Sequence, residues 1–186
     1  MNLNRRTALA AAIAAVSLAG ASAPAQARPG AADLTSSGRQ SLDMLYATEP
    51  KARFYARHAL AVLVFPSIYK GGLMVGAQTG DGVLFMGGRP SGFFNASAVS
   101  FGLQAGGQKY SAAMFFMNRR ALGYLHRSGG WAIGSTPNVV IVNTGAALEA
   151  NTTNLTQDVY IVPFGQKGLM AGIDIHASKI TEIHPN

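Results

Sequence analysis

Short apolar runs, punctuated by glycine and proline, dominate the pattern of hydrophobic and polar positions along this chain. Residues 59–82 read ALAVLVFPSIYKGGLMVGAQTGDG. The run 61–65 predicts a buried strand, and Pro66, which cannot donate a ladder hydrogen bond, predicts a turn before Lys70 and a second strand. We therefore expect a hairpin of two buried strands, with a third strand at 82–87 after a turn at 79–81.

Helical patterns lie before and between further strand patterns. Apolar spacing predicts one helix from Asp33 to about Ala47, capped by Asp33, Thr35 or Ser36, and a second over residues 50–60. Asn118 is a suitable N-cap for a third helix at 119–126. Further candidate strands lie at 99–117, 131–134, 139–142, 158–164, 168–175 and 179–183, with turns at 89–92, 165–167 and 177–178.

These patterns predict an α+β fold. We expect a largely antiparallel, strongly curved or barrel-like β-sheet with two N-terminal helices and one inserted helix. The run 112–117 is apolar throughout, which is typical of a strand covered on both faces. Residues 28–32 are expected to be a loose tether, and residues 146–156 give no clear pattern.

The first 27 residues have the features of an export signal. Arg5-Arg6 precedes an apolar run at 8–18, and Ala25-Gln26-Ala27 is a small-x-small cleavage site. The run is too short to span about 30 Å of hydrocarbon. We expect cleavage after Ala27, leaving 28–186 as a single exported domain of the periplasm or cell envelope, or a secreted one. Ordinary secretion and twin-arginine export both stay open.

Composition narrows the possible partners. The chain has no cysteine, which excludes disulfides, thiolate metal sites and a lipidated cysteine. Its formal net charge is +7, and removal of Arg5 and Arg6 would leave 13 basic against 8 acidic residues, or +5. A positive excess favours anionic surfaces such as lipid headgroups, envelope polysaccharide or nucleic acid.

Signatures of catalysis and of metal binding are missing from the sequence. The four histidines, at 58, 126, 176 and 184, show no HExxH or His-x-His spacing, and no GxSxG elbow occurs. Residues 102–107, GLQAGG, lack the Lys-Ser/Thr of a phosphate loop. We therefore predict neither an enzyme nor a metal or cofactor site.

Basic residues without neighbouring acids form the remaining candidate site. Arginine's planar fork and lysine's point charge both match phosphate, and each basic residue near an anionic membrane contributes about 1 kcal/mol. A face that is merely solvated is the competing interpretation. Nucleic acid is disfavoured, because no aromatics are interleaved with the arginines. The candidate lipid-binding residues are Lys51, Arg53, Arg57, Lys70, Arg119, Arg120 and Arg127.

Four blocks in order resemble the SYLF (Ysc84-like) lipid-binding domain. They are VLVFPSIYKGGLMVGAQTGDGVL, SFGLQAGGQ, an apolar strand leading into a helix that ends at Leu125, and KGLMAGIDIHASKI, together covering roughly 40–183. The resemblance implies non-enzymatic binding of phosphoinositides or other anionic phospholipids, with Lys70 near a headgroup and residues 33–60 as the amphipathic lipid-binding portion. With the export signal, it implies a secreted bacterial member. The alternative is an exported structural or protein-interaction module of the cell envelope.

Overall fold

The computed structural model describes residues 28–134, 136–142, 155–168 and 178–186. Within these ranges the side chains of residues 73, 74, 100–105 and 168 are not described. The expected export signal, the strand at 168–175 and His176 therefore lie outside the described residues, and the turn at 177–178 lies partly outside them.

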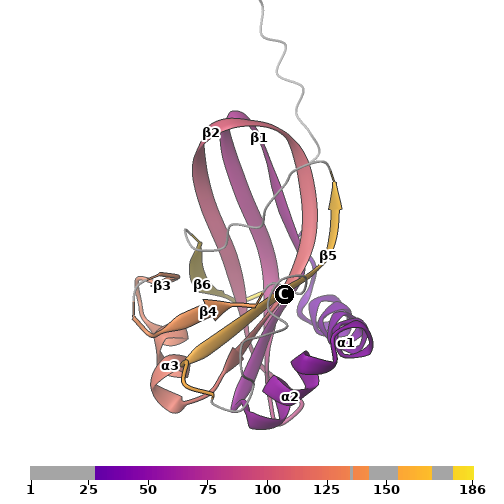
Figure 1. Cartoon of the computed structure of the whole chain (residues 1–186), viewed down its shortest axis with the longest axis vertical. Helices are drawn as coiled ribbons and strands as arrows, with labels where there is room; N and C mark the ends of the chain where they lie inside the picture. The colour runs from indigo at the N-terminus through magenta and orange to yellow at the C-terminus, as the bar shows by residue number, and fades with distance from the viewer. Residues whose placement is uncertain (1–27, 135, 143–154, 169–177) are drawn as a thin grey trace, which may run out of the picture.

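Two long antiparallel strands form the centre of the fold. β1 (Ala61–Met86) and β2 (Arg89–Phe116) pair from Ala61↔Phe116 to Met86↔Arg89. Gly87 and Gly88 join the two strands, and both have positive φ values, which glycine adopts without steric penalty. Both strands bend, so that each has two legs and the sheet curls (Figure 1).

The predicted interruptions of these strands are wrong. β1 runs unbroken through Pro66, Lys70 and residues 79–81, and residues 89–92 begin β2 instead of forming a turn. Pro66 is accommodated because a register shift separates Phe65 from Ile68, and the Pro66 carbonyl accepts a hydrogen bond from Ser111 Oγ at 2.8 Å. The chain instead reverses direction near Gly72, where a Cβ atom would collide with the backbone of Val75 and Gly76.

Four shorter strands complete the sheet of the described residues. They are β3 (Trp131–Ala132), β4 (Val139–Ile141), β5 (Val159–Gly168) and β6 (Lys179–Ile183). The order is β3-β6-β2-β5-β4, with β1 paired to β2, and β4–β5 is parallel whereas the other pairs are antiparallel. The expected α+β class with a curved, largely antiparallel sheet is confirmed. The expected turn at 165–167 is wrong, because β5 continues through it.

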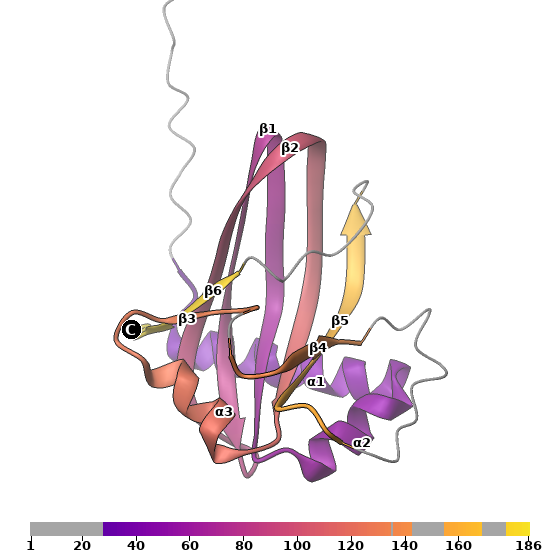
Figure 2. The ribbon, with the colours of Figure 1, turned by 60° about the vertical axis from the view of Figure 1, so that its left-hand side comes forward.

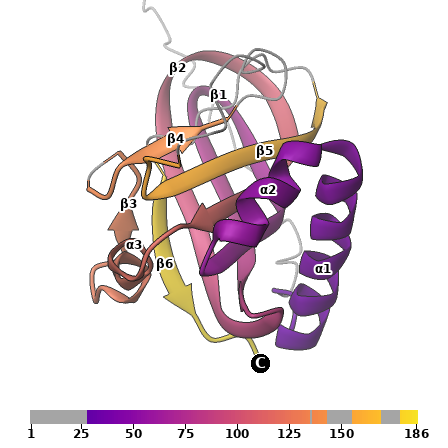
Figure 3. The same ribbon diagram turned by 60° about the horizontal axis from the view of Figure 1, so that its bottom comes forward.

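The helices agree with the expected number and order. α1 (Ala31–Thr48) and α2 (Pro50–His58) lie together against the sheet, and α3 (Arg119–Gly123) continues into the 3₁₀ turn η1 (Tyr124–His126) (Figure 3). Asn118 caps α3 as predicted, since its Oδ1 accepts from the Ala121 N–H at 2.8 Å. Gly30, and none of the three predicted residues, is the N-cap of α1.

Residues 28–32 are not a loose tether. Ala31 begins α1, and its N–H donates to the Asn186 carbonyl at 3.0 Å. Arg28 Nε lies 4.0 Å from Asp81 Oδ2 of β1. The start of the described chain is therefore held against β1 and against the end of the chain.

Alternating side chains of the central strands build two cores. Leu63 and Phe65 join Phe116, Ile161 and Trp131 in the first core. The intervening residues of the same strands join α1 and α2 in the second, which contains Leu34, Leu45, Val62, Val64, Phe115 and Val162. The apolar runs at 61–65 and 112–116 are continuous because both of their faces are covered, as expected.

Glycine allows the two legs of β1 to approach each other closely. A Cβ atom at Gly82 would lie 2.5 Å from Phe65 Cδ1 and 2.7 Å from the Val64 carbonyl oxygen, and one at Gly80 would lie 2.6 Å from the Ser67 carbonyl. All three separations are far inside van der Waals contact. The curl of the sheet therefore requires glycine, which has no side chain, at these two positions.

Candidate functional site: basic surfaces and a lysine pocket

The seven predicted site residues do not form one surface. Lys51, Arg53 and Arg57 lie on α2, while Arg119, Arg120 and Arg127 lie on or just after α3 and η1. Lys70 lies within β1, nine positions after Ala61, which at about 3.3 Å per residue is roughly 30 Å from the end of the strand beside α2. The expectation that Lys70 sits on a tight turn next to the basic helix is wrong.

The basic face of α2 is partly used within the protein. Arg53 Nε donates to the Tyr46 carbonyl at 2.8 Å, which ties α2 to the last turns of α1. Arg57 is exposed in the last turn, where a positive charge complements the helix dipole. Arg57 therefore remains available for an external anion, whereas Arg53 has a structural contact to lose.

The arginines around α3 also have neighbours. Arg120 Nη2 donates to both carboxylate oxygens of Asp158, at 3.1 and 3.0 Å, and the Arg127 guanidinium carbon lies 3.7 Å from the Tyr124 ring centroid. Asp158 also accepts from Asn118 Nδ2 at 2.6 Å and from the Asn138 N–H at 3.0 Å. The bond from Asn118, more than the Asn138 N–H and Arg120, holds the pKa of Asp158 below its usual value.

Asp158 is thus the acid that the sequence did not place beside these arginines. It lies immediately before β5 and joins the start of α3 to the segment before β4. Arg120 serves this junction, because it donates to both oxygens of the buried Asp158 carboxylate. Among the three arginines here, Arg119 is exposed and makes no such contact.

Two further lysines join Lys70 at the bent end of the sheet. Lys109 of β2 and Lys167 of β5 are direct cross-strand partners and both are exposed. Lys109 also faces Tyr69 of β1, with its Nζ 5.3 Å from the ring centroid. Like charges directly opposite each other in a sheet are destabilising. The pair Lys109–Lys167 therefore carries an energetic penalty that an anion would relieve.

These side chains line an open pocket of about 610 Å³, which we call the lysine pocket. Gly71 and Gly107 are cross-strand partners, and a Cβ atom at Gly107 would meet nothing within 4 Å, so this part of the pocket is bare backbone beside open space. No carboxylate is among the described residues that line it. The lining residues are Tyr69, Lys70, Gly71, Ala77, Thr79, Gly107, Gln108, Lys109 and Lys167.

Gln108 has an unusual environment within this pocket lining. Its side chain is 4% exposed, and neither the amide nitrogen nor the amide oxygen has a hydrogen-bond partner among the residues that the structure describes. It is the cross-strand partner of Lys70, which is 8% exposed and makes no ion pair with any described residue. Burying an unpaired polar group costs about 1–3 kcal/mol. The pocket therefore contains both unneutralised positive charge and unused hydrogen-bonding capacity.

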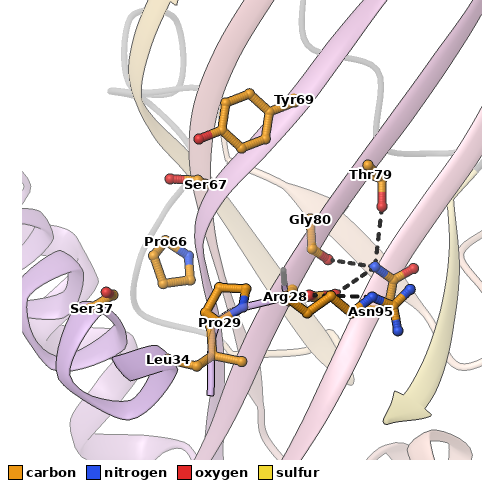
Figure 4. Close-up of a pocket in the computed structure, with 11 residues that line it drawn as sticks. Arg28, Pro29, Leu34, Ser37, Pro66, Ser67, Tyr69, Thr79, Gly80 and Asn95 are labelled. Atoms are coloured by element: carbon orange, nitrogen blue, oxygen red, sulfur yellow. Dashed lines mark hydrogen bonds and ion pairs between the residues drawn. The ribbon is translucent and has the colours of Figure 1, made fainter. Parts of the chain in front are cut away.

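A second pocket of similar volume lies farther along β1 and is satisfied internally. Figure 4 shows Asn95 beside Thr79 and Gly80, and its Nδ2 donates to Asp81 Oδ1 at 2.7 Å and Thr79 Oγ1 at 3.1 Å. Arg28 supplies the positive partner of Asp81. Asn95, Asp81 and Arg28 already have partners within this pocket. An anion is therefore less expected here than in the lysine pocket.

Sequence reasoning found Lys70 but missed Lys109 and Lys167. A usable signal was present, because each missed lysine ends a Gly-Gln-Lys triplet, at 107–109 and 165–167. The pattern predicts a turn at the second triplet, so Lys167 is not expected on a strand beside Lys109. In the described part of the chain no group of three or more potential metal ligands occurs, and no helix is long and apolar enough to cross a membrane.

Comparison with known proteins links part of the chain to a protein family. A search of curated proteins found no similar sequence. The family model Ysc84, described as "Las17-binding protein actin regulator", matches residues 97–184. The match includes Lys109 and Lys167 but begins after Lys70. This is a family of actin- and lipid-binding domains, consistent with a non-enzymatic binding role. Residues 97–184 of this chain are therefore similar to the Ysc84 (SYLF) domain family.

Proposed function

We propose that this protein binds the surface of anionic phospholipid membranes without catalysis, and that the lysine pocket makes the main contact. The observation that carries the proposal is the direct pairing of Lys109 with Lys167, beside Lys70, in a pocket whose described lining includes no carboxylate. A phosphate group would neutralise this charge and accept hydrogen bonds from the lysine ammonium groups.

The position of the pocket suits a flat charged surface. It lies toward the bent end of β1 and β2, which projects away from α1, α2 and α3 (Figure 2). The two exposed lysines at about 1 kcal/mol each supply roughly 2 kcal/mol, or about thirtyfold in affinity. Attachment of this strength is reversible, and it weakens as salt screens the exposed charges.

The basic face of α2 is the competing contact. Lys51, Arg53 and Arg57 lie beside the start of the first leg of β1, whereas Lys70 lies near its bent end. One point of contact therefore cannot include both regions. The exposed Arg119 near α3 is a further candidate on that side. Charge reversal in each region, one region at a time, separates the alternatives.

The test is sedimentation with phosphatidylcholine vesicles, with and without phosphatidylglycerol, at low and high salt. We expect binding only to the anionic vesicles, and only at low salt. Lys109→Glu combined with Lys167→Glu should reduce it at least a hundredfold, whereas Lys51→Glu with Arg57→Glu should change it little. Circular dichroism checks that both variants fold. Binding that survives the first pair and is lost with the second would place the contact on α2.

A protein partner is the alternative function, and the description of the matching family names one for its members. In that case the wild-type protein would not sediment with anionic vesicles at any salt concentration. We also propose export, with mature protein beginning at Arg28. Amino-terminal sequencing of protein recovered from the cell envelope tests this, and recovery of the intact Met1 terminus would contradict it.

A further inference from the structure

Large hydrophobic side chains are exposed next to the lysine pocket. Tyr69 is 56% exposed, Val75 is 54% exposed and Val99 is 61% exposed. Val75 pairs with Phe101 and Ala77 pairs with Val99, so the two valines are diagonal neighbours on adjacent strands. A valine with half its surface in water forgoes hydrophobic stabilisation, and here two of them lie side by side.

The valines lie past the bend of β1 and the lysines lie before it, on the two sides of the same projecting end. The reversal of β1 near Gly72 places Val75 just past the bend, while Tyr69 and Lys70 precede it. Lys109 is level with Tyr69, and Lys167 is level with Lys109. The projecting end of β1 and β2 (Figures 1 and 2) thus carries two exposed valines on one side of the bend, and Tyr69 with the exposed Lys109 and Lys167 on the other.

This combination of side chains suits the boundary layer of a lipid bilayer. Lysine and tyrosine extend an apolar stem and a polar end group, so they are favoured at the boundary between acyl chains and headgroups. Side chains without a polar end are stable deeper. β1 and β2 stay paired on both sides of the bend, from Lys70↔Gln108 to Val75↔Phe101, so much of the backbone here is already hydrogen-bonded.

We propose that the bent end of β1 and β2 inserts into the outer layer of an anionic bilayer. Val75 and Val99 enter the acyl region, while Tyr69, Lys109 and Lys167 remain among the headgroups. This inference rests on the membrane binding proposed above and adds the depth and orientation of the bound protein. A second copy of the chain is a poorer occupant, because a symmetric contact would bring two exposed lysine pairs together.

The absence of cysteine from the sequence allows a direct test of depth. Val75→Cys and Val99→Cys are each labelled with a fluorophore whose emission rises and shifts to the blue in an apolar environment. The matched control is Leu60→Cys, since Leu60 is 44% exposed at the far end of β1. The labelled proteins are mixed with phosphatidylcholine–phosphatidylglycerol vesicles, with and without bromine on the acyl chains.

We expect blue-shifted emission, quenched by the brominated lipids, for labels at 75 and 99 and no change at 60. Val75→Ser with Val99→Ser should weaken sedimentation about tenfold, equivalent to about 1.4 kcal/mol, without altering its salt dependence. Vesicle binding with labels at 75 and 99 that stay in water would overturn the insertion and leave the proposed function standing. No binding of the unlabelled wild-type protein would overturn both.

Discussion

The close approach of the two legs of β1 predicts opposite outcomes for two glycine substitutions. In Gly82→Ala the new methyl group would lie 2.7 Å from the Val64 carbonyl oxygen and 2.5 Å from the Phe65 ring. An ordinary carbon contact is about 3.5–4.0 Å, so the legs would have to separate by close to 1 Å. In Gly107→Ala, also within a central strand, the methyl group would meet nothing within 4 Å.

The difference between the two variants isolates the contact. Alanine lowers the backbone entropy of the unfolded chain relative to glycine, which favours either variant by about 0.5–1 kcal/mol. This gain cancels when the variants are compared. What remains is the cost of overpacking at Gly82, about 1–3 kcal/mol. At roughly 2–4 °C per kcal/mol for a domain of this size, the melting temperatures should differ by several degrees.

Urea unfolding followed by tryptophan fluorescence measures the difference. Trp131, the only tryptophan in the chain, is 1% exposed and packs against Phe116 and Tyr124 in the first core. We expect Gly107→Ala to be as stable as the wild type or more so, and Gly82→Ala to unfold at lower urea. Equal midpoints for the two variants would refute the idea that the legs of β1 touch at Gly82.

Other predictions concern buried polar groups and helix α1. Asp158→Asn should destabilise by about 2 kcal/mol at pH 7, because it replaces a charged acceptor. Since the pKa of Asp158 is lowered, its stabilisation is present above the unfolded pKa of about 3.9 and is lost as pH falls through the folded pKa. Urea midpoints between pH 7 and pH 2 should therefore fall less steeply in the variant; parallel curves would contradict this. Gln108→Leu should raise the free energy of unfolding by about 1–3 kcal/mol while weakening anionic-vesicle binding. An unchanged or lower stability would mean that the amide is satisfied. Gly38→Ala should destabilise, because its methyl group would collide with Val83 beneath α1. Differential scanning calorimetry measures this, and a higher melting temperature would show that the helix gains more than the packing loses.

Local signals in the sequence were sufficient for the elements and the fold class. Asn118 predicted the start of α3 because a cap acts within a few residues, and the apolar run at 112–116 predicted a strand covered on both faces. The continuity of β1 through Pro66 was missed. It depends on a register shift and on a hydrogen bond from Ser111, which is 45 residues away in the sequence.

The site was predicted less completely than the fold, for a related reason. The grouping by sequence neighbourhood placed Lys70 with α2, 12 positions before it, yet the straight first leg of β1 carries it away from that helix. Its actual neighbours, Lys109 and Lys167, come from strands whose pairing is fixed only by the whole sheet. Likewise the sequence has no acid close to Arg120, and the fold brings Asp158 to it from 38 positions away.

The turn at Gly87–Gly88 gives this sheet a natural order of assembly. Met86 and Arg89 meet across two residues, and each later pair of β1 and β2 then closes only a slightly longer loop than the one before it, up to Ala61↔Phe116. Such a ribbon can grow from the turn outward like a zip, so that no single step closes a long loop of free chain. β5 and β6 pair only with strands that come before them in the sequence, and during synthesis they would add to an edge that already exists. The projecting bend would then form midway through zipping, before the end of the ribbon beside α2 is closed.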